Sequence, residues 1–511
     1  MQDTIAAIAT PPGSGGIGVI RVSGPLARSI LGARFAPASP VFRDFRPWTL
    51  HRGAALDQEG GRIDDVLAVF MPGPRTFTGE DVAEWHCHGG PALLEALLES
   101  ILAAGARPAE RGEFTRRAFL NGRMDLTQAE AVAEVIAAPS REGARLAAAR
   151  LHGLLGARMT ALRDTLENLR ARMCLAVDFP EEEAECLSPA DLLAGVAAVD
   201  EAAAGLLAAF DRARCWREGV TAALAGPVNA GKSSLMNALL GRERAIVTDH
   251  PGTTRDFLEE SVRLDGLPAR LIDTAGLRGA DAALDPAERQ GIRLGQEKTA
   301  EADVIFLVFD GSRNEGGVPP ELPGLAADLA GKGRDDRIIL VWNKRDLAPP
   351  PEGWAAVWRN AWRNAVRATG IPPSAPAEQG VGQSAGQGAD RGKDHPGEGN
   401  EPWTAAVSAR SGEGLDDLAR LARRVALAGR LTPAGSVDGE ETLAPNLRQA
   451  VVLRRLRQDL ASLAADARDG VPYDLCAVRL EVAVAALAEI TGLDTPDEVL
   501  NRIFASFCIG K

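Results

Sequence analysis

The stretch from Gly226 to Ser233 reads GPVNAGKS and matches the phosphate-loop pattern G-x-x-x-x-G-K-[ST] at every fixed position. It follows a short apolar run and precedes the apolar segment Leu235 to Leu240, so it is expected to join a strand to a helix. Glycines let backbone N–H groups turn toward phosphate oxygens, and the start of the helix adds partial positive charge. The predicted nucleotide contacts here are Asn229, Ala230, Gly231, Lys232, Ser233 and Ser234. Lys232 is expected to neutralise the β and γ phosphates, and Ser233 to give its hydroxyl to magnesium.

Two further motifs follow this loop. The segment GTTRD begins at Gly252, and a predicted hairpin through Asp265-Gly266 leads to a strand that ends in Asp273-Thr274-Ala275-Gly276. Asp273 is expected to orient magnesium or its bound water, Gly276 to place an N–H at the γ-phosphate, and Thr254 to close over the metal. Both segments are therefore predicted to change with nucleotide hydrolysis.

A third motif, Asn343-Lys344-Arg345-Asp346, follows an apolar strand predicted at residues 337–342. Asp346 can accept both N–H groups on the guanine edge, whereas adenine would leave that carboxylate unpaired. Asn343 and the Lys344 stem are expected to hold the base. Ser408-Ala409-Arg410, after a predicted strand at 404–407, would support this loop. Ordered motifs of this kind at strand ends predict a GTPase.

Composition places the chain among globular proteins of several domains. It has 511 residues, of which 45% are hydrophobic and 25% charged, and two to four domains are expected. The net charge of -13 argues against a protein that coats nucleic acid through bulk positive charge. No uncharged apolar run is long enough to span a bilayer, so no membrane partner is expected. The cysteines lack a Cys-x-x-Cys pair, which suits a cytoplasmic location: Cys87, Cys174, Cys186, Cys215, Cys476 and Cys508.

The chain divides into four predicted segments. Residues 1–118 form a small α+β domain, with strands expected at 4–10, 18–23, 66–71 and 82–88 and a helix at 91–104. Residues 119–217 and 431–511 are two helical halves of similar composition, and residues 218–430 alternate β and α. This order predicts a discontinuous α-helical domain that carries an inserted Ras-like α/β P-loop domain. Two separate helical domains are the alternative. Residues 372–402 are rich in Gly, Pro, Gln and Ser and are predicted to be a disordered insert.

Leu277 raises a question about the mechanism of hydrolysis. In Ras-like proteins the residue after Asp-x-x-Gly is a glutamine that positions the attacking water, and an apolar side chain cannot do so. Three possibilities remain: hydrolysis is very slow, a polar residue arrives from elsewhere in the chain, or a partner protein supplies the chemistry.

The chain resembles the MnmE (TrmE) family of tRNA modification GTPases in its N-terminal TPPGSGGIGVIRVSG, its GTTRD segment and its C-terminal FCIGK. The resemblance implies a homodimer joined through N-terminal domains that bind a reduced folate, either 5-formyltetrahydrofolate or methylenetetrahydrofolate. It also implies potassium-dependent pairing of GTPase domains. In a heterotetramer with the FAD-dependent MnmG, such proteins add an aminomethyl or carboxymethylaminomethyl group to carbon 5 of the wobble uridine of certain tRNAs.

The resemblance also implies residue roles in the GTPase domain. Asn229 matches the potassium-binding asparagine. A loop that also contacts the nucleotide completes the potassium site through Thr248, His250 and Thr253. This loop comprises Thr248, Asp249, His250, Pro251, Gly252 and Thr253. A cation there would neutralise charge that develops between the phosphates. Glu288 matches the glutamate that orients the attacking water, which would resolve the Leu277 question. Its alternative interpretation is a solvated helix carboxylate.

The folate contacts implied by the resemblance are Arg21, Glu84, Arg123 and Lys511. A carboxylate can bind the amide and amino edge of a pterin, and cations suit the glutamate tail of folate. Cys508 matches a tail cysteine for which a covalent role toward uridine carbon 6 has been considered; its alternative is a small packed residue.

Two alternatives concern other classes of site and function. His86-Cys87-His88 could suggest a metal site, but strand packing is the favoured interpretation because no further ligand cluster is evident. The rival function is a ribosome-assembly GTPase switch without modification chemistry. It would require a basic RNA-binding module, whereas Arg454, Arg455 and Arg457 are interpreted as a solvated helix face.

Overall fold

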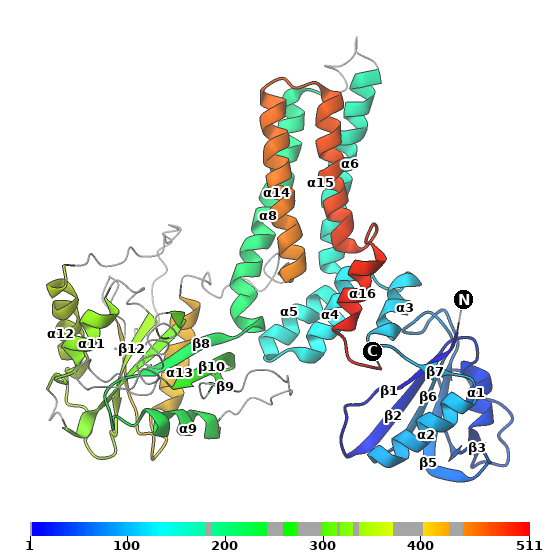
Figure 1. Ribbon diagram of the computed structural model, residues 1–511, viewed down its shortest axis with the longest axis horizontal. Helices are drawn as coiled ribbons and strands as arrows, with labels where there is room; N and C mark the ends of the chain where they lie inside the picture. The colour runs from blue at the N-terminus through cyan, green and yellow to red at the C-terminus, as the bar shows by residue number, and fades with distance from the viewer. Residues whose placement is uncertain are drawn as a thin grey trace, which may run out of the picture. The chain divides into compact units, whose positions relative to one another are not determined.

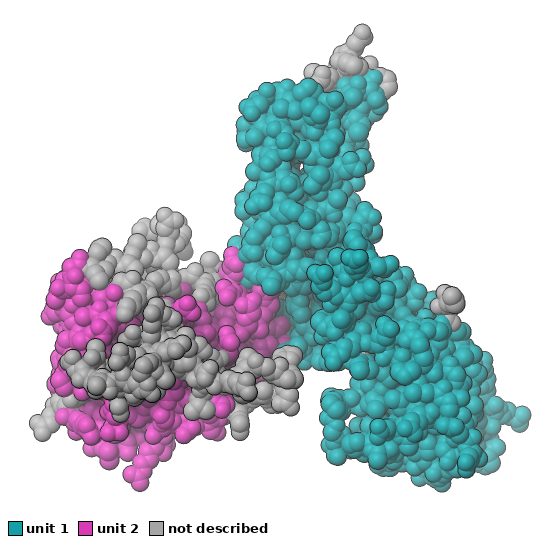
Figure 2. Space-filling model, in the orientation of Figure 1, with its two compact units in different colours: residues 1–137, 144–210, 438–511 teal, residues 138–143, 211–437 magenta. Residues whose placement is uncertain are grey.

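The computed structural model describes residues 3–178, 187–242, 259–273, 299, 301–313, 317–330, 337–370, 402–428 and 443–510. The chain forms two compact units, shown in different colours in Figure 2. Unit 1 comprises residues 1–137, 144–210 and 438–511, and unit 2 comprises residues 138–143 and 211–437.

The N-terminal part of unit 1 is a seven-stranded sheet in the order β3-β4-β5-β6-β2-β1-β7. Its strands and helices are β1 (Ile5–Ile8), β2 (Gly15–Ser23), α1 (Ala27–Ala33), β3 (Phe35–Pro37), β4 (His51–Leu56), β5 (Arg62–Met71), β6 (Val82–Gly89), α2 (Pro91–Ala103) and β7 (Arg107–Pro108). The predicted strands and the helix at 91–104 are confirmed, although the first strand ends at Ile8 rather than Thr10. Ile20, Trp85 and Leu97 lie in the core between the sheet and its helices. Because side chains alternate along a strand, Arg21 and Glu84 lie on the opposite face.

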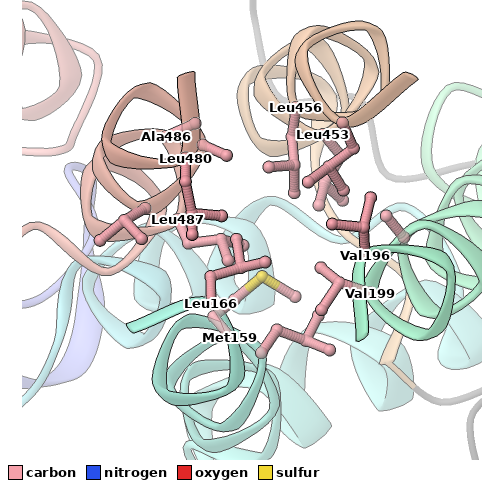
Figure 3. Close-up of a cluster of buried hydrophobic side chains, with 14 of the residues drawn as sticks. Met159, Leu166, Val196, Val199, Leu453, Leu456, Leu480, Ala486 and Leu487 are labelled. Carbon is pink, nitrogen blue, oxygen red and sulfur yellow. The ribbon is translucent and has the colours of Figure 1, made fainter. Parts of the chain in front are cut away.

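Four long helices form the second part of unit 1: α6 (Leu154–Asp178), α8 (Pro189–Arg217), α14 (Leu447–Arg468) and α15 (Tyr473–Thr491). Figure 3 shows Leu166 and Val199, from before unit 2 in the sequence, in one core with Leu453 and Leu487, from after it. The helical domain is therefore discontinuous, and the alternative of two separate helical domains is wrong. Shorter helices complete the unit: α3 (Glu113–Leu120), α4 (Leu126–Ala137), α5 (Arg141–Leu151) and α16 (Asp497–Ala505).

Helix α8 is distinctive for its apolar composition. Of the helices in the described ranges, it alone is long and apolar enough to cross a membrane by length and composition. Leu192, Val196 and Phe210 of this helix are buried in the four-helix core. The packing of unit 1 thus accounts for these apolar residues.

Unit 2 contains a six-stranded sheet, of which β8, β9, β10 and β12 are labelled in Figure 1. The strand order is β13-β12-β11-β8-β10-β9, and all neighbours are parallel except β9 and β10. Its elements are β8 (Val220–Ala225), α9 (Lys232–Arg242), β9 (Glu259–Leu264), β10 (Leu267–Asp273), β11 (Val304–Asp310), η2 (Gly311–Arg313), α11 (Leu322–Leu329), β12 (Ile338–Asn343), α12 (Trp354–Ala368), β13 (Trp403–Ala406) and α13 (Leu415–Leu427). Strands β11 and β12 are buried at every position, as expected for central parallel strands.

The unit 2 sheet brings its functional segments to one edge. Helices α11 and α12 pack on one face, and α9 and α13 also contact the sheet. Asp265 and Gly266 both have positive φ, at 51° and 78°, which confirms the predicted tight hairpin between β9 and β10. The carboxyl ends of the parallel strands β8, β10, β11 and β12 meet at one edge, where ligands bind in folds of this type.

Candidate functional sites

The phosphate loop joins β8 to α9, and its glycines have conformations that side chains rarely adopt. Gly226 and Gly231 have φ values of 134° and 90°. A Cβ at Gly226 would collide with the Val308 carbonyl, and one at Gly231 would collide with the Asn343 amide. Asn229, at φ 65°, is also left-handed. The backbone thus needs glycine to turn between strand and helix.

Lys232 lies within this loop. Its Nζ donates hydrogen bonds to the carbonyls of Gly226 at 2.9 Å and Pro227 at 2.8 Å. Burial lowers the pKa of Lys232, and the nearby Asp273 carboxylate opposes this change only in part. The two carbonyls accept hydrogen bonds from two of the three N–H groups of the ammonium and do not neutralise its charge, so an anion such as a phosphate is the ligand that this position favours.

Ser233 and Asp273 form a set of oxygen atoms that fits magnesium. Ser233 Oγ at the start of α9 donates to Asp273 Oδ2 at the end of β10, over 2.8 Å. Asp273 Oδ1 is buried and has no hydrogen-bond partner within the described ranges. Hydroxyl and carboxylate oxygens are the ligands that magnesium prefers, usually together with phosphate and water.

The predicted base-binding motif, Asn343 to Asp346, is held by hydrogen bonds between distant segments. Asn343 donates from Nδ2 to the Ala230 carbonyl at 3.0 Å and accepts from the Ala409 N–H at 3.2 Å. Ser408 Oγ donates to Asp346 Oδ1 at 2.6 Å. The structure therefore brings the phosphate loop, the end of β12 and the loop after β13 together, while the Asp346 residue stays exposed.

Asp310 belongs to this site and was not identified by the sequence motifs. It ends β11 beside Asn343 in parallel register, and its Oδ2 accepts a hydrogen bond from Lys344 Nζ at 2.7 Å. Burial alone would raise the pKa of Asp310, but hydrogen bonds from Lys344 and Ser312 outweigh it and hold the pKa below its usual value. The sequence signal that could have identified Asp310 is a single acidic residue at the end of an otherwise apolar strand.

Arg21 and Glu84 form an ion pair on the sheet of unit 1. Arg21 Nε donates to Glu84 Oε1 at 2.7 Å, and His86 Nε2 lies 3.1 Å from Glu84 Oε2. The Arg21 and Glu84 side chains are only 19% and 14% exposed. Burial would raise the pKa of Glu84, but the hydrogen bonds and charges of His86 and Arg21 hold it below its usual value.

Comparison with known proteins decides the family. The model of the GTP-binding protein TrmE N-terminus matches residues 4–123, and the model of the MnmE helical domain matches residues 126–508. The chain is 52% identical over 516 residues to the tRNA modification GTPase MnmE of Nitratidesulfovibrio vulgaris (strain DP4), covering 100% of this chain and 99% of that protein. The chain belongs to the MnmE family. The MnmE of Lawsonia intracellularis is 48% identical over 511 residues, with 100% of both chains covered.

Membership of the MnmE family makes this chain a tRNA modification GTPase, and the rival assignment as a ribosome-assembly switch is set aside. Among solved structures, the G domain of the T. maritima FeoB iron transporter is 24% identical over 40% of this chain and 98% of that chain. Its TM-score of 0.24 is too low to carry an argument.

Several predicted MnmE site residues lie outside the described residues. They are Thr248 to Thr254, Thr274, Ala275, Gly276, Leu277, Glu288 and Lys511. Most of the predicted insert, residues 372–402, is also outside the described part of the chain. The roles assigned to these residues stay predictions.

The C-terminal tail of this MnmE chain contacts the N-terminal sheet within unit 1. The Gly112 N–H lies 3.4 Å from the Cys508 carbonyl oxygen, to which it donates. Gly510, at φ 93°, lies so close to β1 that a Cβ would be 2.5 Å from the Ile8 carbonyl oxygen. Strand β1 pairs with β2, which carries Arg21. The tail therefore lies against the strand next to the Arg21–Glu84 pair, with Cys508 exposed.

Cys87 is a packed residue of strand β6. Its side chain is buried in the sheet core, and Sγ donates to the Gly18 carbonyl at 3.3 Å. Burial raises the pKa of its thiol to about 11. His86 pairs with Glu84 and His88 with Asp64, and no group of three or more metal-binding side chains occurs within the described ranges. These contacts agree with strand packing rather than a metal site.

The three arginines on α14 contact other helices of unit 1. Arg454 lies over the Phe210 ring at 5.4 Å. Arg455 pairs with Glu489 at 2.6 Å, and Arg457 pairs with Asp200 at 2.7 Å. Arg455 and Arg457 remain 54% and 42% exposed, as expected for a solvated face, but each is neutralised by its own carboxylate.

Proposed function

We propose that this chain hydrolyses GTP to drive addition of an aminomethyl or carboxymethylaminomethyl group to carbon 5 of the wobble uridine of certain tRNAs, with a reduced folate as the one-carbon donor. The observation that carries the folate assignment is the Arg21–Glu84 pair, on the strand beside the one that the C-terminal tail contacts. Family membership supports the tRNA and GTP parts of the proposal.

The surroundings of the Arg21–Glu84 pair fit a folate. Glu84 can accept from the amide and amino groups of a pterin edge, which suits a carboxylate whose pKa is lowered. The rings of Phe77 and Phe114 lie 5.9 Å from the Arg21 guanidinium, and Phe77 is partly exposed. Arg123 donates to the Thr76 carbonyl at 3.1 Å, one residue from Phe77. Arg21, Arg123 and Lys511 would supply positive charge for the glutamate tail.

Calorimetric titration with 5-formyltetrahydrofolate tests this site. We expect saturable binding to the full-length protein and, for Arg21→Ala, an affinity lower by roughly 10- to 100-fold, because charged hydrogen bonds contribute about 1.5–3 kcal/mol. Arg62→Ala removes an exposed arginine from the same sheet and should bind folate normally. If the wild type hydrolyses GTP but does not bind the folate, the one-carbon assignment is wrong; if Arg21→Ala binds normally, only the placement of the site is wrong.

Two cations are proposed for the GTPase site. Ser233 and Asp273 would hold magnesium, together with Thr254 of the GTTRD segment. Asn229 would bind potassium together with Thr248, His250 and Thr253. Asn229 lies in the phosphate loop with φ 65°, and its carbonyl accepts a hydrogen bond from Lys344 Nζ at 3.2 Å.

Exchange of potassium for sodium at constant ionic strength should lower the turnover number for GTP by at least about 10-fold, since a cation between the phosphates acts in the place of an arginine finger. Steady-state phosphate release measures this change. Asn229→Ala should hydrolyse GTP at the same low rate in potassium and in sodium. Equal wild-type rates in sodium and potassium would contradict the potassium site.

The remaining assignments complete the proposed assembly. The chain would act in the cytoplasm as a homodimer joined through its N-terminal domains, and in a heterotetramer with the FAD-dependent MnmG. Its domain boundaries would lie near residues 118, 217 and 430. Cys508 is exposed, which suits a thiolate that adds to uridine carbon 6 and so makes carbon 5 nucleophilic. The alternative for Cys508, a small packed residue, predicts that Cys508→Ser retains modification activity, which a modification assay tests.

A further inference from the structure

Asp310 is a buried carboxylate at the end of an otherwise apolar strand. It is 8% exposed and follows the residues VIFLVF in β11. A buried carboxylate is costly unless its oxygens are paired. Asp310 Oδ1 accepts from Ser312 N–H at 3.1 Å and from Ser312 Oγ at 2.6 Å, and Oδ2 accepts from Lys344 Nζ at 2.7 Å. The Ser312 contacts orient the carboxylate group so that Oδ2 faces Lys344, and the exposed Arg313 Nε lies farther from the same oxygen, at 3.4 Å.

Lys344 thereby spans two parts of the nucleotide site. Its Nζ also donates to the Asn229 carbonyl in the phosphate loop at 3.2 Å. The Lys344 backbone is left-handed, with φ 62°, and its side chain is 32% exposed. The ammonium group is therefore hydrogen-bonded to two parts of the site, while about a third of the side chain stays exposed. A lysine with a free ammonium would have to be ordered at the moment of binding, which weakens affinity.

The short helix η2, which follows Asp310, lies close against β12. A Cβ at Gly311 would collide with the Trp342 indole, so the start of η2 and this ring are in close contact. Trp342 Nε1 donates to the Ala348 carbonyl at 3.1 Å, and the ring is stacked on Trp358 with centroids 5.3 Å apart. The parallel register sets Asp310 beside Asn343, next to the lysine that it binds. Strand register and the packing of Gly311 on Trp342 thus position Asp310 from within unit 2.

We propose that Asp310 is a positioning residue for guanine nucleotides, which fixes the Lys344 ammonium so that the lysine stem lies preformed along the face of the base. This inference rests on the proposed base-binding role of Lys344. It requires that GTP and GDP lose affinity equally when Asp310 is replaced, because the stem faces the base and not the phosphates. The turnover number at saturating GTP should change little, since Asp310 does not contact the reacting atoms.

A double-mutant cycle on the full-length protein tests the proposal, with GDP and GTP affinities measured by calorimetry. We expect Asp310→Ala to lower the affinity for both nucleotides by about 10-fold. The variant loses the charged hydrogen bond that orders Lys344 before the nucleotide binds. In a Lys344→Met background, which keeps a stem but has no ammonium, Asp310→Ala should change affinity by less than about 2-fold. Asp416→Ala removes an exposed carboxylate from another ion pair of unit 2 and should bind normally.

The outcomes separate this inference from the site on which it rests. If Lys344→Ala, which removes the stem, binds GDP as tightly as the wild type, the base-binding assignment itself fails; if Lys344→Met alone does so, the ammonium is not needed and the positioning role is overturned. If Lys344→Met weakens binding but Asp310→Ala costs as much in that background as in the wild type, the site stands and the positioning role is overturned. Thermal unfolding of each variant identifies a general loss of structure, which would affect both backgrounds equally and would likewise count against the proposal.

Discussion

Asp346→Asn is expected to change the preferred base of this GTPase from guanine to xanthine. The carboxylate can accept two N–H groups from guanine, whereas an asparagine amide offers one acceptor and one donor, which opposes a guanine N–H. Xanthine carries a carbonyl oxygen where guanine carries an amino group, so the amide donor would gain a partner. Ser408 Oγ, 2.6 Å from Asp346 Oδ1, can still donate to the asparagine oxygen and hold its orientation.

The expected loss of GDP affinity in Asp346→Asn is on the order of 100- to 1000-fold, from unpaired groups and a lost charge. Calorimetry with GDP and xanthosine diphosphate measures both sides of the change. Asp416→Asn, in an exposed ion pair of the same unit, serves as the control and should retain GDP binding. A variant that keeps GDP affinity within a few-fold, with no gain for the xanthine nucleotide, would show that Asp346 does not read the base.

Glu288→Ala is expected to lower GTP hydrolysis by about 100- to 1000-fold and to leave GTP affinity nearly unchanged. Leu277 cannot orient the attacking water, so the proposed role of Glu288 is to position that water in the transition state. An interaction made only in the transition state changes the turnover number and not ground-state binding. Single-turnover hydrolysis and calorimetry with a non-hydrolysable GTP analogue measure the two quantities separately.

Glu301→Ala is the matched control for Glu288, because it removes an exposed carboxylate from the same unit. It should hydrolyse GTP at the wild-type rate. Comparable rates for Glu288→Ala and wild type would exclude the catalytic role, and the alternative of a solvated helix carboxylate would stand. A parallel loss of affinity and hydrolysis would instead indicate that Glu288 supports the structure of the site.

Local sequence patterns predicted the strand, turn and helix that surround the candidate nucleotide site. The phosphate loop is a local structure, since Gly226 and Gly231 take positive φ values that other residues rarely adopt, and Lys232 and Ser233 follow in a fixed register. The hairpin at Asp265-Gly266 is likewise a local structure. So are the strands, which are predicted from alternating polar and apolar residues or from a continuous apolar run. Each of these features depends on residues that are close together in the chain.

The sequence by itself therefore determined the order of the elements, the phosphate loop and the base-binding motif, because backbone conformation and strand periodicity are short-range properties. Only the tertiary structure decided that α6 and α8 share one core with α14 and α15, that Arg21 meets Glu84, and that Asp310 meets Lys344. These contacts depend on strand register and on the packing of segments far apart in the chain. Neither is encoded in any local pattern, so the partner of a buried charge becomes known only when the sheet is assembled.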